Sequence, residues 1–147
     1  MNKEFAQLME SNITILAWLS ERLRIHDSPL FQYPRQQLKI LVRLYMGGRA
    51  MLKEIARRES VPASNLCAAF RNLERDGMVR REVDKLDRRN TWYSATAKGT
   101  KLARRAMDEF RARILELFSG LSAKDEAKLT AAMKTMNKIL NKMKMEN

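Results

Sequence analysis

The stretch from Leu52 to Gly99 constrains the fold of this chain more than any other part of its sequence. Apolar residues at helical spacing predict a short helix beginning at Leu52, a turn at Val61-Pro62, and a second helix from about Ala63 to Arg75. Two β-prone segments joined by a charged loop come next. A helix-turn-helix followed by a charged β-hairpin is a shape that fits a DNA duplex, with one helix in the major groove and the hairpin beside it.

The hairpin is predicted from its segments and from the residues around it. Val79 to Val83 and Thr91 to Ala95 are the β-prone segments, and the loop from Asp84 to Asn90 joins them. Asp76-Gly77 is expected to end the preceding helix, because glycine readily adopts the left-handed conformation at a helix C-terminus. Thr96 is a suitable N-cap for the helix that follows.

The positive charge of the chain is concentrated on this same segment. Lys plus Arg number 29 against 17 Asp plus Glu, which gives a formal net charge of +12. Residues 49–105 hold 15 basic and 7 acidic side chains, so they carry +8 of that charge. A basic surface that is merely solvated would have the same composition. Its concentration on one candidate DNA-binding unit favours attraction to a polyanion.

Several other classes of protein do not fit the sequence. Cys67 is the single cysteine and His26 the single histidine, which excludes a disulfide framework and a first-row metal site. The longest apolar run, Ile13 to Leu19, is too short to span a bilayer, and there is no signal-peptide layout, so we expect a cytoplasmic protein that does not enter membranes. Neither a catalytic constellation nor a glycine-rich phosphate loop is found, so we expect neither an enzyme nor a bound cofactor.

Further helices are predicted on both sides of the helix-turn-helix. A helix over the first 25 residues has an apolar face formed by Phe5, Met9, Leu16, Leu19 and Leu23. A helix from Pro34 to Gly47-Gly48 is expected to bury Leu38, Leu41, Val42 and Tyr45. After the hairpin, one helix has the seam Ala103, Met107, Phe110, Ile114 and Leu117. A last helix, opened by a capping box at Ser122 and Asp125, has the seam Leu129, Met133, Met136, Leu140 and Met143.

These terminal helices offer more apolar surface than a winged helix of roughly 50 residues needs for its core. We expect them to pair with a second copy in a homodimer, the alternative being an intramolecular bundle packed on its own winged helix. The predicted fold class is mainly α with a small β-wing (α+β). It is a single integrated domain with an N-terminal dimerisation helix and linking helix (1–48), a winged helix-turn-helix (49–99) and C-terminal dimerisation helices (100–147).

Six segments carry a resemblance to a known family: Pro34 to Leu41, Leu52 to Ala56, Asn72 to Arg81, Asp84 to Arg89, Thr96 to Gly99, and Leu121 to Glu126. In these segments the chain resembles the MarR family, the winged-helix regulators named for multiple antibiotic resistance. The most specific part is an Asp-x-Arg wing some seven residues before a Thr-x-x-Gly helix start. The resemblance implies a dimeric transcriptional regulator of pseudo-palindromic DNA, in most cases a repressor released by a small molecule.

The resemblance also implies which residues contact DNA. In the helix from Ala63 to Arg75, which would be the recognition helix, the outward residues are Ser64, Asn65, Cys67, Ala68 and Arg71. Ser64 and Asn65 are expected at base edges or phosphates, and Arg71 at either. Ala68 stands where the family commonly has arginine, so this helix has fewer side chains that read bases.

The wing supplies the second set of expected contacts. Arg89 is expected in the minor groove, with Asp87 orienting its guanidinium before binding. Arg88 and Lys85 are expected at phosphates. An exposed ion pair on a hairpin is the alternative interpretation of Asp87 and Arg89.

An effector site is less clearly indicated by the sequence. Small aromatic ligands of the family bind between the dimerisation helices and the winged helix, where Trp18, Tyr33 and Tyr45 are the candidates, with ordinary core as the alternative. Cys67 is a candidate redox sensor or an inert surface residue. Two other functions remain open: a non-specific architectural DNA-binding protein, and a helical module that holds a protein partner through its terminal seams.

Overall fold

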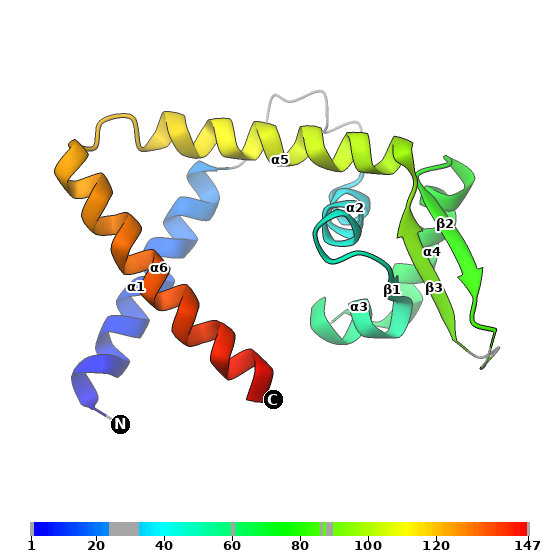
Figure 1. Cartoon of the computed structure of the whole chain (residues 1–147), viewed down its shortest axis with the longest axis horizontal. Coiled ribbons are helices and arrows are strands. Elements are labelled where there is room, and N and C mark those ends of the chain that lie inside the picture. The colour runs from blue at the N-terminus through cyan, green and yellow to red at the C-terminus, as the bar shows by residue number, and fades with distance from the viewer. Residues whose placement is uncertain (1, 24–32, 60, 86, 88–89, 147) are drawn as a thin grey trace. The chain divides into compact units, whose positions relative to one another are not determined.

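The computed structural model describes residues 2–23, 33–59, 61–85, 87 and 90–146. Its helices are α1 (Lys3–Arg22), α2 (Arg35–Gly47), α3 (Leu52–Glu59), α4 (Ala63–Arg75), α5 (Ala97–Leu117) and α6 (Ala123–Glu146). Its strands are β1 (Ala50–Met51), β2 (Val79–Val83) and β3 (Thr91–Ala95). The predicted fold class, mainly helical with a small β-wing, is confirmed (Figure 1).

The chain divides into two compact units, residues 1–113 and residues 114–147. The first unit contains the helix-turn-helix and the wing, and α5 runs across the boundary between the units. Among the helices of the described residues, none combines the length and the apolar character needed to cross a membrane.

The three strands form an antiparallel sheet in the order β1-β3-β2. In the hairpin, Val79 lies opposite Ala95 and Val83 opposite Thr91, so both strands begin and end where the sequence predicts. Strand β1 pairs Met51 with Trp92 of β3. Strand β1 was not predicted, because two residues are too few to show an alternating pattern.

The core of the first unit lies between α2, α3, α4, the sheet and the start of α5. The inner face of α4 is the one predicted, with Leu66, Ala69, Phe70 and Leu73 all buried. The other buried apolar residues of this core are Ile40, Leu41 and Leu44 of α2, Ile55 of α3, Met78 directly before β2, Val79 of β2, and Leu102 and Ala103 of α5.

The predicted buried face of α2 is only partly right. Leu41 is buried, but Leu38 and Val42 are half-buried and Tyr45 is 38% exposed. The residues that are buried with Leu41 are Gln37, Ile40 and Leu44. Apolar residues lie on several sides of this helix, so its pattern alone does not determine which stripe faces the core. The buried stripe is shifted by about one residue from the predicted one.

The helices α1 and α6 have capped N-termini but little burial. Asn2 caps α1 by accepting a hydrogen bond from the Glu4 N–H, with 3.0 Å between the atoms. Ser122 Oγ accepts from the Asp125 N–H at 3.1 Å and donates to the Asp125 carboxylate at 2.7 Å, so the predicted capping pair forms at the start of α6. No residue of α1 is buried, and every described side chain of α6 is exposed.

Candidate nucleic-acid interface

The outer face of α4 carries the polar side chains expected of a recognition helix. With the apolar face in the core, Ser64, Asn65 and Arg71 are exposed on the other side, and Ala68 is exposed between them. Pro62 occupies the N-cap and carries no oxygen that can cap the helix. The positive end of the helix dipole therefore lies beside Ser64 and Asn65, where it favours a phosphate.

Cys67 lies at the flank of α4 and is half-buried. Its neighbour on the sheet is Tyr93, whose ring centroid lies 4.2 Å from that of Phe70. Burial raises the pKa of Tyr93 most, Arg81 lowers it, and Glu74 and Cys67 raise it further. These groups therefore surround the tyrosine hydroxyl at the junction of α4 and the wing.

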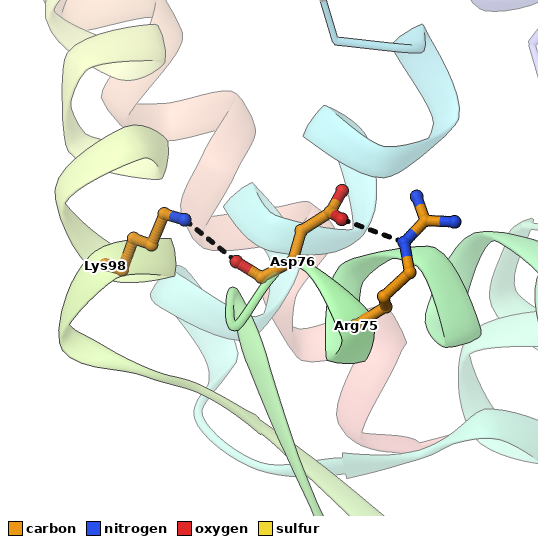
Figure 2. Close-up of polar contacts among 3 residues, drawn as sticks. All are labelled: Arg75, Asp76 and Lys98. Atoms are coloured by element: carbon orange, nitrogen blue, oxygen red, sulfur yellow. Dashed lines mark hydrogen bonds and ion pairs between the residues drawn. The ribbon is translucent and has the colours of Figure 1, made fainter.

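The C-terminal end of α4 is fixed to the start of α5. Asp76 caps α4 and Gly77 follows with a φ of +68°, the left-handed conformation predicted for this position. Lys98 Nζ donates to the Asp76 carbonyl oxygen at 2.9 Å, and Arg75 Nε pairs with the Asp76 carboxylate at 3.1 Å (Figure 2). These contacts fix the end of α4 at the base of the wing.

The Thr-x-x-Gly motif has a structural explanation at this junction. Thr96 Oγ1 accepts from the Gly99 N–H at 3.2 Å, as an N-cap does, and donates to the Gly77 carbonyl oxygen at 2.7 Å. A Cβ atom at position 99 would overlap the carbonyl oxygen of Met78. Glycine at this position therefore allows α5 to lie directly against the first residues of the wing.

The loop of the wing is organised by two aspartates and an asparagine. The Asp84 N–H donates to the Asn90 carbonyl oxygen at 3.0 Å, and the Asp87 N–H donates to Asp84 Oδ1 at 3.2 Å. Asn90 Nδ2 donates to Asp87 Oδ2 at 3.1 Å. Lys85 and Asp87 are exposed on this loop, as predicted for the tip of a wing. Arg88 and Arg89, the other predicted wing contacts, lie outside the described residues.

The side chains that join the base of the wing to the helix-turn-helix were not predicted from the sequence. Trp92 Nε1 donates to Asp84 Oδ2 at 2.8 Å, and the guanidinium of Arg49 lies 4.6 Å from the centroid of the Trp92 rings. Lys53 Nζ of α3 donates to Asn90 Oδ1 at 2.8 Å. The signal that was available is Trp92 itself, since the N–H of a partly buried tryptophan needs an acceptor.

One known protein family matches the part of the sequence that forms the helix-turn-helix and the start of the wing. Residues 34–91 match the sequence model of the MarR family, and this range runs from the N-cap of α2 through the helix-turn-helix to the first residue of β3. Over these residues the chain is similar to the MarR family.

Similarity to individual proteins and solved structures agrees with that match. The HTH-type transcriptional regulator YkoM of Bacillus subtilis is 29% identical over 110 residues, which cover 75% of this chain and 71% of YkoM. The apo form of E. coli MarR has the same fold, with a TM-score of 0.74, 20% identity, and coverage of 88% of this chain and 95% of that one. Bordetella bronchiseptica BpsR, whose DNA binding is regulated by 6-hydroxynicotinic acid, has a TM-score of 0.62, 15% identity, and coverage of 87% and 98%.

The three predicted effector residues are not among the lining residues of two cavities found in the described part of the chain. Trp18 is 51% exposed on α1, with the Arg22 guanidinium 5.6 Å from the centroid of its rings. Tyr33 is half-buried and packs against the core of the first unit, and Tyr45 is exposed on α2.

A cavity of about 420 Å³ lies instead between α2, α3 and the start of α4. Ile40, Ile55 and Leu66 are among its apolar lining residues, and Arg35, Lys39 and Arg43 line it from α2. The spacing of these three cations places them on one face of the helix. This basic face was not predicted from the sequence, although α2 contains no acidic residue.

Proposed function

We propose that this protein is a homodimeric MarR-family repressor that binds a pseudo-palindromic DNA site in the cytoplasm and is released by a small-molecule effector. The observation that carries the proposal is the exposed polar face of α4, beside a basic wing, in a helix-turn-helix similar to that of this family. The function is one of binding, without catalysis. BpsR, which shares the fold, supports it because its DNA binding is regulated by a small molecule.

In this proposal two sets of side chains contact the DNA, one on α4 and one on the wing. Asn65 and Ser64, at the exposed N-terminal end of α4, contact base edges or the nearest phosphate, and Arg71 reaches either. Cys67, half-buried at the flank, contributes van der Waals contact along the groove wall. Because Ala68 is too short to reach a base edge, we assign a larger share of the affinity to the wing.

On the wing, Arg89 enters the minor groove and Asp87 orients it, while Arg88 and Lys85 neutralise phosphates. The basic face of α2, formed by Arg35, Lys39 and Arg43, adds further positive charge beside the recognition helix. This charge strengthens binding to any duplex, whereas the contacts of α4 select the sequence.

A second copy of the chain is the proposed partner of the terminal helices. On α1, seven large apolar side chains are between 41% and 63% exposed, and α6 exposes six that are between 41% and 55% exposed. Apolar surface on this scale marks an interface, and pairing it with the same surface of another copy gives a two-fold dimer. A two-fold dimer presents two recognition helices, which matches a pseudo-palindromic site.

Selection of DNA from a random-sequence library tests the proposal without assuming any target sequence. We expect the enriched sequences to share two inverted half-sites whose centres lie about 10 base pairs, or a multiple of that, apart. Light scattering of the complex should show two chains per duplex. A library that emerges without any shared sequence would favour a non-specific architectural protein, and failure to bind any DNA would favour a module for protein partners.

The effector is tested separately, by release of the selected DNA. Trp18, Tyr33 and Tyr45 are the candidate contacts for a small aromatic compound, each with an apolar ring and a polar group. We expect at least one compound in a library of aromatic acids and phenols to release the DNA, and substitution of a contacting residue to abolish that effect. If release survives substitution of all three residues, the effector binds elsewhere.

A further inference from the structure

In addition to the sheet and the packing of Tyr93 on Phe70, polar and charged side chains attach the base of the wing to the helix-turn-helix. Arg49, directly before β1, stacks its guanidinium on Trp92 of β3. Lys53, in the first turn of α3, donates to the side chain of Asn90 at the end of the wing loop. Met51, between them, donates its N–H to the Glu54 carboxylate at 3.0 Å, which holds β1 against α3.

Trp92 connects the Arg49 contact to the loop of the wing. Its strand is the central one, so Trp92 lies opposite Met51 of β1 on one side and Glu82 of β2 on the other. Its indole N–H donates to Asp84, and the other oxygen of the same carboxylate accepts the backbone N–H of Asp87. One tryptophan therefore links the helix-turn-helix to the turn that carries the tip of the wing.

We propose that Trp92 is a positioning residue that sets the direction of the wing tip relative to the recognition helix, acting through Asp84 and supported by Arg49. This inference rests on the proposed DNA-binding function and explains how a long loop at the end of a two-stranded ribbon is held in place before binding. Hydrogen bonds to a charged group are roughly twice as strong as neutral ones, which suits Asp84 to this task. Ordering the loop in advance lowers the entropy lost when the wing binds DNA.

A double-mutant cycle on DNA affinity separates positioning from general stability. Trp92→Phe keeps an aromatic ring in the strand but removes the N–H that Asp84 accepts. We expect it to weaken binding to the selected DNA by about tenfold, the order of one hydrogen bond to a charged group. In an Arg89→Ala background it should weaken binding by less than about twofold, because the DNA contact proposed for the wing tip is already gone. Ser94→Ala, two residues further along the same strand, is the matched control and should leave affinity unchanged.

A second variant, Asp84→Asn, separates the effect of the lost hydrogen bond on DNA affinity from the effect of the changed charge. Asp84→Asn adds one positive charge to the protein, and charge alone would tighten DNA binding. Asparagine replaces one of the two accepting oxygens by an NH2 group, which would face the N–H of either Trp92 or Asp87 and cannot accept from it, so we expect weaker binding. Arg49→Lys keeps the charge but loses the planar stack, and should weaken binding without changing its dependence on salt.

The outcomes distinguish this inference from the function on which it rests. If Arg89→Ala binds more weakly than the wild type, but Trp92→Phe and Asp84→Asn bind as the wild type does, the wing contacts DNA and the positioning role is wrong. An equal loss from Trp92→Phe in both backgrounds also overturns it, since the residue would then act independently of the wing tip. If the wild type binds no DNA, both the inference and the proposed function fail. Thermal unfolding of each variant shows whether it is folded, and Asp84→Asn serves if Trp92→Phe is not.

Discussion

Replacing Gly99 by alanine tests how α5 is fixed against the wing. The added Cβ would overlap the Met78 carbonyl oxygen and lie 3.0 Å from Leu41 Cδ2, so either the backbone or the core must move. The Met78 oxygen also accepts the Thr96 N–H at 3.0 Å and the Thr96 hydroxyl at 3.2 Å, so its displacement strains two hydrogen bonds. The added Cβ therefore cannot be accommodated without moving the Met78 backbone or the Leu41 side chain.

The expected loss follows from two opposing terms. Overpacking costs typically about 1–3 kcal/mol, and an overlap with backbone belongs at the upper end of that range. Alanine in a helix recovers about 0.5–1 kcal/mol relative to glycine. The net loss of unfolding free energy is about 2 kcal/mol, which lowers the urea midpoint by about 1 M for a typical m-value.

Gly47→Ala is the matched control for this variant. Gly47 is also helical, at the end of α2, but nothing lies within 4 Å of the place its Cβ would take. We expect Gly47→Ala to be as stable as the wild type or more stable by up to about 1 kcal/mol. Urea unfolding should be followed at one protein concentration, because association shifts apparent stability. If Gly99→Ala unfolds at the same urea concentration as Gly47→Ala, the packing argument is wrong.

Three further predictions concern the sheet, the dimer and the recognition helix. Burial raises the pKa of Tyr93 above 10.0, so its stabilising effect is complete below pH 10 and is lost as pH rises through the higher folded-state pKa. Above pH 10 the thermal midpoint of Tyr93→Phe should therefore fall less than that of the wild type. If the two midpoints fall in parallel, Tyr93 is not the cause of the pH dependence. Leu140→Glu should make the protein monomeric in light scattering, whereas Asn141→Glu, exposed on the same turn of α6, should leave it dimeric; a dimer in both cases would remove α6 from the interface. Asn65→Ala should reduce affinity for the selected DNA about tenfold and leave affinity for random DNA unchanged, and equal losses on both would mean that Asn65 contacts only phosphate.

The elements that sequence predicted most accurately are those whose boundaries are set by local chemistry. Gly77 ends α4 because the chain needs a left-handed residue there, and Thr96 begins α5 because its hydroxyl caps the helix. Between them, the charged loop separates two β-prone segments at the residues where the strands end. The inner face of α4 was predicted correctly because its outward positions are polar or small.

The features that sequence did not predict depend on contacts between distant segments. The buried stripe of α2 is chosen by the shape of the winged helix, since apolar residues lie on several sides of that helix. Strand β1 exists because β3 offers a free edge, and its two residues have no pattern of their own. The link from Arg49 to Trp92 joins residues 43 positions apart, so no local rule could reveal it.

The central claim is that the exposed face of α4 reads a DNA sequence while the wing and the basic surface supply affinity. Competition between the selected palindromic duplex and a duplex of the same composition with both half-sites scrambled, at one fixed salt concentration, tests it most directly. We predict that the palindrome is bound roughly a thousandfold or more tightly. Equal affinity for the two duplexes would contradict sequence-specific recognition by this protein.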